Sequence, residues 1–185
     1  MRFLPFLLAM VALPSVISFA IPDEVFSFCQ SPTIVSETLI GEDGNVEVQA
    51  LQCANTLTPA ETGVDKRQNL PVNVCGATCD TNCFVPSGGG PNPNECHVIS
   101  DALLFNSQNI GPLFNITTDA ALIVMQFRSC LSFFVNQAGI DLTYCRTDWA
   151  SVLDFVAFNC QAPQNAHGGN CVARNQQWFI QVQHS

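Results

Sequence analysis

One short stretch of the sequence combines residue types that exchange protons. Glu95, His97 and Asp101 lie within seven positions, and a helix would place His97 and Asp101 on one face because they are four residues apart. A ribonuclease needs such a base and acid, and Arg128 and His184 would join them if their strands were neighbours. The alternative is a surface histidine beside a carboxylate. The chain has no nucleophile elbow, P-loop, HExxH or dinucleotide motif, so we predict no catalytic residue.

Amide side chains give a second chemical signal. Residues 68–185 contain thirteen asparagines and ten glutamines. Amides donate and accept hydrogen bonds together, so they match the vicinal hydroxyls of sugars without a charge. The alternative is that they replace Lys and Glu on the surface of an extracellular protein. We expect an oligosaccharide, or a glycan on a glycoprotein, to contact residues of the polar strand edges and one loop: Gln126, Arg128, Asn165, His167, Asn170, Gln177, Gln181 and Gln183.

The charge distribution argues against phosphate ligands. The whole chain has a formal net charge of −9, but residues 68–185 hold seven acids and three arginines, which gives −4. Because no basic stripe is present, binding to nucleic acid is not expected. No stretch after the first twenty residues reaches the roughly 18 apolar residues of a spanning helix, so stable membrane insertion is not expected either. No motif indicates a cofactor.

The first part of the chain has the pattern of a secretory precursor. Arg2, the apolar run 3–16 and the small residues ending at Ala20 predict a signal peptide over residues 1–20. Residues 21–67 carry eight acids, and their only bases are Lys66 and Arg67 at the end. A dibasic pair after the loop-like run 58–63 is typical of furin- or Kex2-type cleavage. We predict an acidic propeptide over 21–67 and a secreted, extracellular domain over 68–185.

Cysteine usage agrees with an oxidising compartment. Two cysteines precede Arg67 and eight follow it, and both counts are even, which suits a separate disulfide set in each piece. The spacing of Cys75, Cys79 and Cys83 lacks the CxxC pairs of zinc sites, so disulfides are favoured over a metal. Asn115 begins a glycosylation sequon. The pairing stays open, since eight cysteines allow 105 pairings: Cys29, Cys53, Cys75, Cys79, Cys83, Cys96, Cys130, Cys145, Cys160 and Cys171.

Periodicity predicts the elements that position these residues. Asn94 can cap a helix that starts at Glu95 and ends before Gly111-Pro112. Alternating apolar residues over 123–135 indicate one long strand, or two strands bent near Ser129-Cys130. A second helix follows Thr147 as its N-cap, with a stripe at i, i+3, i+4, i+7 and i+11. The last strand alternates at 177–183, and both tryptophans are expected in the core.

These elements favour one fold class. We predict an α+β fold, formed by a single small disulfide-rich domain in which an antiparallel sheet is layered with helices. Several motifs of residues 74–185 also resemble one family of small secreted proteins of mushroom-forming fungi, typified by an ink-cap glycan-binding protein with a Y-three-like glycan-binding domain. The motifs lie at 74–83, the Gly-rich loop after it, 95–99, 128–130, 133–136, 144–149 and 165–171.

The resemblance implies a fold and a function. It implies helix–sheet–helix layering and lectin-like binding of oligosaccharides without catalysis, with toxic or antiviral effects in the type protein. A sheet covered on both faces should not carry a glutamine-lined face, unless those glutamines lie at an edge or line a pocket. The alternatives are a secreted effector or killer-toxin-like protein that acts on a protein or membrane, and a small ribonuclease-like hydrolase.

Overall fold

The computed structural model of this protein describes residues 20–55, 57 and 70–185. The signal peptide up to residue 19 and the predicted cleavage after Arg67 therefore lie outside the described residues. Within the described part, no helix is long and apolar enough to cross a membrane.

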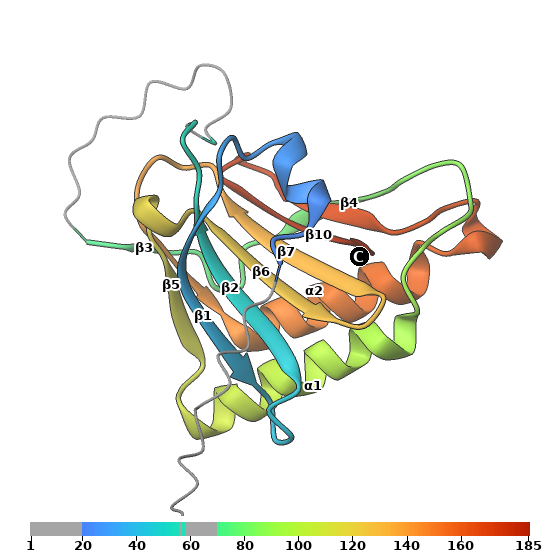
Figure 1. The fold of residues 1–185 in the computed structure, drawn as a ribbon, viewed down its shortest axis with the longest axis horizontal. Helices are drawn as coiled ribbons and strands as arrows, with labels where there is room; N and C mark the ends of the chain where they lie inside the picture. Colours follow the sequence, from blue (N-terminus) through green and yellow to red (C-terminus); the bar gives the residue numbers. More distant parts are fainter. Residues whose placement is uncertain (1–19, 56, 58–69) are drawn as a thin grey trace, which may run out of the picture.

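A seven-stranded sheet, antiparallel throughout, runs through the centre of the molecule (Figure 1). Its strands, in spatial order, are β1 (Thr33–Ile40), β2 (Val46–Gln52), β6 (Leu122–Phe127), β7 (Cys130–Asn136), β10 (Trp178–His184), β9 (Gly169–Ala173) and β4 (Cys79–Cys83). A second sheet has three strands in the order β3 (Val72–Asn73), β8 (Leu142–Cys145) and β5 (Leu113–Ile116). The antiparallel α+β class predicted from the sequence is confirmed.

Both α-helices lie on the same face of the large sheet. Helix α1 (Pro93–Asn109) and helix α2 (Arg146–Asn159) run side by side there (Figure 1), and α1 contacts β6 and β7 while α2 contacts β9 and β10. Trp149 and Trp178 are fully buried in the core between helices and sheet, as predicted. The helix–sheet–helix layering is not confirmed, because the one helix that the described residues place on the opposite face is a short 3-10 helix.

That 3-10 helix, η1 (Asp23–Ser27), covers part of the other face and makes a second core. Val25 and Leu51 are fully buried there, and the Phe28 ring stacks on Phe133 with 5.2 Å between ring centroids. Phe179 packs edge-on against the same Phe133 ring. Two further 3-10 helices, η2 (Thr118–Ala120) and η3 (Ala162–Gln164), lie in connections.

Residues 20–55 belong to the same sheet as the rest of the chain. Strand β2 pairs with β6 from Glu47↔Gln126 to Leu51↔Leu122, and β1 forms the outer edge beside β2. The acidic composition of this segment predicts a propeptide and does not indicate these strands. Its acids explain why: Glu37 and Glu47 interrupt the apolar pattern on the sheet face that the helices do not cover.

Local sequence sets the ends of the main elements. The 123–135 stretch forms two strands, and Arg128 in the turn between them adopts φ 49°. Helix α1 is capped by Asn92, whose side-chain oxygen accepts from Asn94 N–H, with Pro93 in its first turn. Asn94 and Thr147 are therefore not the N-caps that we predicted, since α2 begins one residue before Thr147.

Five disulfides use all ten cysteines, and none is free. Cys29–Cys53 is internal to the first segment, and the other four lie within residues 70–185, as the even counts predicted. The closely spaced cysteines each bond a distant partner, so they do not form a metal cluster. The pairs are Cys75–Cys145, Cys79–Cys171, Cys83–Cys160 and Cys96–Cys130.

Candidate functional site

Amide side chains gather on the face of the large sheet opposite α1 and α2, over β10, β9 and β4. Gln181 pairs with Asn170, and Asn170 pairs with Asn82, so the three side chains project from the same face. Asn82 Nδ2 donates to Asn170 Oδ1 at 3.2 Å, and Gln181 donates to the side-chain oxygen of Gln183. We call Asn82, Asn170, Gln181 and Gln183 the amide cluster. None of the four is buried.

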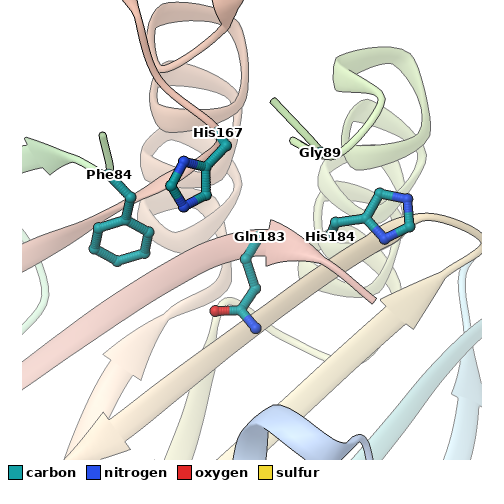
Figure 2. Close-up of a pocket in the computed structure, with 5 residues that line it drawn as sticks. All are labelled: Phe84, Gly89, His167, Gln183 and His184. Atoms are coloured by element: carbon teal, nitrogen blue, oxygen red, sulfur yellow. The ribbon is translucent and has the colours of Figure 1, made fainter. Parts of the chain in front are cut away.

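An open pocket of about 360 Å³ adjoins this cluster at the end of β10 (Figure 2). Its size lies at the lower end of the range for small-ligand pockets, roughly 300–1,000 Å³. Gln183 belongs to both the cluster and the pocket, so a ligand seated in the pocket can reach the amides. The pocket is lined by Phe84, Gly89, His167, Gln183 and His184.

Backbone contacts hold the aromatic side of the pocket in place. Phe84 N–H donates to Gly168 O at 2.9 Å, and His167 N–H donates to Phe84 O at 3.0 Å. The two rings consequently lie close, with 6.1 Å between centroids. Gly168 has φ 103°, and a Cβ there would collide with the carbonyl oxygen of Val182. Only glycine therefore lets the loop approach β10 closely enough to place His167 over the pocket.

Both pocket histidines have one ring nitrogen engaged by the backbone. His167 Nδ1 contacts Pro86 O, and His184 Nδ1 contacts Ser185 O at 2.6 Å. A carbonyl oxygen only accepts, so each Nδ1 carries the proton. In the neutral rings Nε2 is then an acceptor. Together with the donor groups of Gln183, the pocket offers both acceptors and donors, and no carboxylate lines it.

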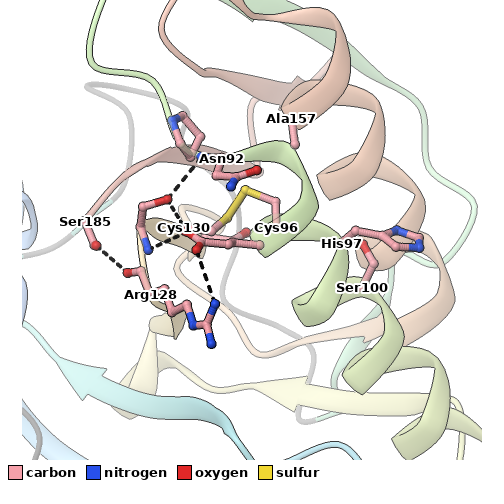
Figure 3. The surroundings of a disulfide bond; sticks show 12 residues. Asn92, Cys96, His97, Ser100, Arg128, Cys130, Ala157 and Ser185 are labelled. Atoms are coloured by element: carbon pink, nitrogen blue, oxygen red, sulfur yellow. Dashed lines mark hydrogen bonds and ion pairs between the residues drawn. A yellow bond between two sulfur atoms is a disulfide. The ribbon is translucent and has the colours of Figure 1, made fainter.

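Arg128 lies in the β6–β7 turn, which Figure 3 shows beside the Cys96–Cys130 disulfide. Its guanidinium lies 3.8 Å from Glu95 and 5.1 Å from the centroid of the Phe127 ring. Ser129 donates to Glu95 through both its backbone N–H (3.0 Å) and its hydroxyl (2.5 Å), which lowers the pKa of Glu95. This arrangement ties the turn to α1, and Arg128 does not line the pocket.

The remaining predicted contact residues divide by position. Gln126 lies on the same sheet face as Gln183, with Leu131 between them. Gln177 precedes β10 at the opposite end of that strand, where its side chain accepts from Asn175 Nδ2 at 3.0 Å. Asn165 adopts φ 54° and accepts from Ser87 N–H, so it shapes the loop.

The proton-exchanging residues from the sequence lie in two groups, with Arg128 beside Glu95 and His97 beside Asp101. His97 contacts Asp154 of α2 at 3.0 Å and Asp101 at 3.7 Å, as its spacing to Asp101 predicted. The hydrogen bond with Asp154 raises the pKa of His97. Ser100 also donates to Asp154, so the group joins the two helices. Figure 3 shows His97 and Arg128 on opposite sides of the Cys96–Cys130 disulfide.

A second polar group lies across the same sheet face, on β1 and β2. Gln49 Nε2 donates to Glu37 at 3.3 Å and to Glu47 at 3.1 Å. Partial burial, with a smaller contribution from Glu37, raises the pKa of Glu47 to about 7. Glu47 pairs with Gln126, so this group continues the polar part of the face toward the β1 edge.

Four residues of the site were not predicted from the sequence, and one of them is Gly89, which lines the pocket. Nothing in the sequence pattern around Phe84 indicates a binding role, and Asn82 is one of thirteen asparagines in residues 68–185. His184 was considered only as an acid–base partner. Among the described residues, Cys75, Cys145 and Asp148 come close enough for a metal. Both sulfurs there are consumed by the Cys75–Cys145 disulfide, so they do not act as thiolate ligands.

Comparisons with known proteins found no match. No family model, no curated protein and no solved structure is similar to this chain. The assignment below therefore depends on the geometry of the site.

Proposed function

We propose that this protein is a secreted carbohydrate-binding protein that holds an uncharged glycan in the pocket beside Phe84 and along the amide cluster. The main support for the proposal is that Gln183 both lines the pocket and belongs to the amide cluster, so the two adjoin. The pocket supplies a concave, partly aromatic surface, and the amides supply paired donors and acceptors for sugar hydroxyls. The five disulfides support an extracellular location.

The charges around the site favour neutral sugars. No acid, lysine or arginine lines the pocket. An anionic ligand would meet no permanent positive charge there. The placement of the glutamines also supports the proposal, because they lie on the one sheet face that the α-helices leave uncovered, where a ligand has access.

A glycan array tests the proposal. The protein, secreted with its disulfides intact, should bind a restricted set of neutral oligosaccharides, and sialylated or sulfated versions should bind no better. Uniform signals across the array would overturn the proposal. The Gln108→Ala variant is a matched control, since Gln108 is an exposed amide on α1, and its array profile should equal that of the parent protein.

The second candidate function, that of a secreted effector, draws on exposed apolar side chains of the two α-helices. Leu104 of α1 and Phe155 and Phe158 of α2 are 38%, 55% and 48% exposed. Large exposed apolar groups are typical of contacts with another protein or a membrane. A secreted effector or killer-toxin-like protein would use such groups. Toxicity that survives Gln181→Ala/Gln183→Ala but is lost in Phe155→Ser/Phe158→Ser would favour the effector over the glycan binder.

A further inference from the structure

Residues 20–55 are joined to residues 70–185 by two kinds of link: the connecting chain and direct contacts. No disulfide crosses between the two parts. Cys29 bonds Cys53, 24 residues away, and every other cysteine finds its partner after residue 70. If the connecting chain were cut, contacts alone would decide whether the first part stays.

The backbone contacts run through strand β2, which is second from the edge of the large sheet. Strand β2 lies between β1 and β6, and its register with β6 covers five residue pairs, from Glu47↔Gln126 to Leu51↔Leu122. This ladder is the same kind of link that joins β6 to β7. Residues 20–55 therefore form one end of the sheet, and the β2–β6 ladder joins them to the rest of it.

The side-chain contacts bury the first part on both faces of the sheet. Val46 is fully buried in the core beneath the helices, while Val25, Cys29 and Leu51 are fully buried in the core on the other face. Phe28 adds its stacked contact with Phe133. Burial on both faces means that the segment cannot leave without opening the two cores together.

Loss of the segment would leave the remainder with an unprotected apolar surface. Strand β6 would become the edge of the sheet, and its ladder groups would be unpaired. Exposed edges and apolar patches of this kind lead to aggregation. The side chains losing their cover on that face would be Leu122, Val124, Leu131, Phe133, Val135 and Phe179.

We propose that residues 20–55 stay bound to residues 70–185, through β2 and η1, after the chain between them is cut. Cleavage after Arg67 then gives a two-chain protein and does not release a free 68–185 domain. The acidic segment is in this respect a permanent part of the molecule, whatever ligand the amide cluster binds.

Limited proteolysis of the full-length secreted protein tests the proposal. A Kex2-type protease cuts at Lys66-Arg67, and native mass spectrometry and gel filtration follow the products. Both fragments should elute together, with a native mass equal to their sum, and separate in denaturant without any reducing agent. A folded, monodisperse 68–185 fragment free of the first segment would overturn the proposal. If the protease leaves the chain intact, a variant with a thrombin site in place of residues 58–63 is cut instead.

Two substitutions locate the contacts that retain the segment. Phe28→Ala removes the stacking on Phe133, so the cut protein should dissociate at a concentration at least about tenfold higher than the parent. Val35→Ala is the control, because Val35 is 54% exposed on the outer strand β1 and should leave dissociation unchanged. Equal dissociation of all three proteins would contradict the assigned interface. These outcomes do not depend on glycan binding.

Discussion

Replacing Phe133 by alanine tests whether the sheet face opposite α1 and α2 holds a second core. The Phe133 side chain is fully buried, stacks on Phe28 at 5.2 Å and meets the edge of Phe179 at 6.4 Å. Removal of a buried phenylalanine leaves a cavity and costs about 3–5 kcal/mol of unfolding free energy. Because this core is smaller than the one beneath the helices, we expect a loss of about 3 kcal/mol for Phe133→Ala.

Urea unfolding of the uncut protein, followed by tryptophan fluorescence, measures this loss. Phe155→Ala is the matched control, since Phe155 is 55% exposed on α2 and its loss should stay within about 0.5 kcal/mol. A double-mutant cycle with Phe28→Ala should give a coupling energy of about 0.5–1.5 kcal/mol. A loss below about 1 kcal/mol for Phe133→Ala, or no coupling, would refute the second core.

Three further predictions concern charge and cross-links. Burial raises the pKa of Glu47 to about 7, so ionisation of Glu47 destabilises the fold as the pH rises from about 4.5 through 7. The Glu47→Gln variant should lack that part of the pH dependence of the unfolding free energy, measured in urea. Because the pKa of His97 is raised in the folded protein, its protonation stabilises the fold fully below pH 6.5, and this stabilisation is lost as the pH rises through the folded pKa. The Asp154→Asn variant should therefore show a flatter dependence of the unfolding free energy on pH above 6.5. Replacing Cys29 and Cys53 together by serine should lower the free energy of unfolding by about 2–4 kcal/mol in calorimetry. A pH profile unchanged in either charge variant, or an unchanged melting curve without the disulfide, would contradict these assignments.

The elements that depend on local pattern were predictable from sequence. The α2 stripe through Trp149 and Leu153 is buried, and the terminal strand buries Trp178, Ile180 and Val182 as its alternation indicated. A hydrophobic period of 3.6 residues in a helix, or of 2 in a strand, shows which side chains face a core, whatever other elements form that core.

The contribution of residues 20–55 was not predictable in the same way. Strand β1 is exposed along almost its whole length, and the one acid of β2, Glu47, lies on a face that is half polar. Acidic composition therefore hid both strands: β2 pairs with β6, more than 70 residues away in the chain, and β1 pairs with β2. Pairing between such distant segments is a tertiary property that periodicity does not report.

The candidate site was predictable in part. Asn170, Gln181 and Gln183 were singled out by residue type, and the sheet brings them together. His167 was also singled out, and the turn at Gly168 places it in the pocket. Gln177 and Arg128 were chosen for the same reasons but lie at other positions, because strand alternation gives the face of a side chain and not its distance from a pocket.

Titration of the best neutral glycan from the array tests the central claim most directly. Calorimetry should compare the parent protein with Gln181→Ala/Gln183→Ala and with the control Gln108→Ala. Each lost hydrogen bond is worth about 1 kcal/mol, so the double variant should bind at least about tenfold more weakly while the control binds as the parent does. Equal affinity of all three proteins would contradict the assignment of the glycan to the amide cluster.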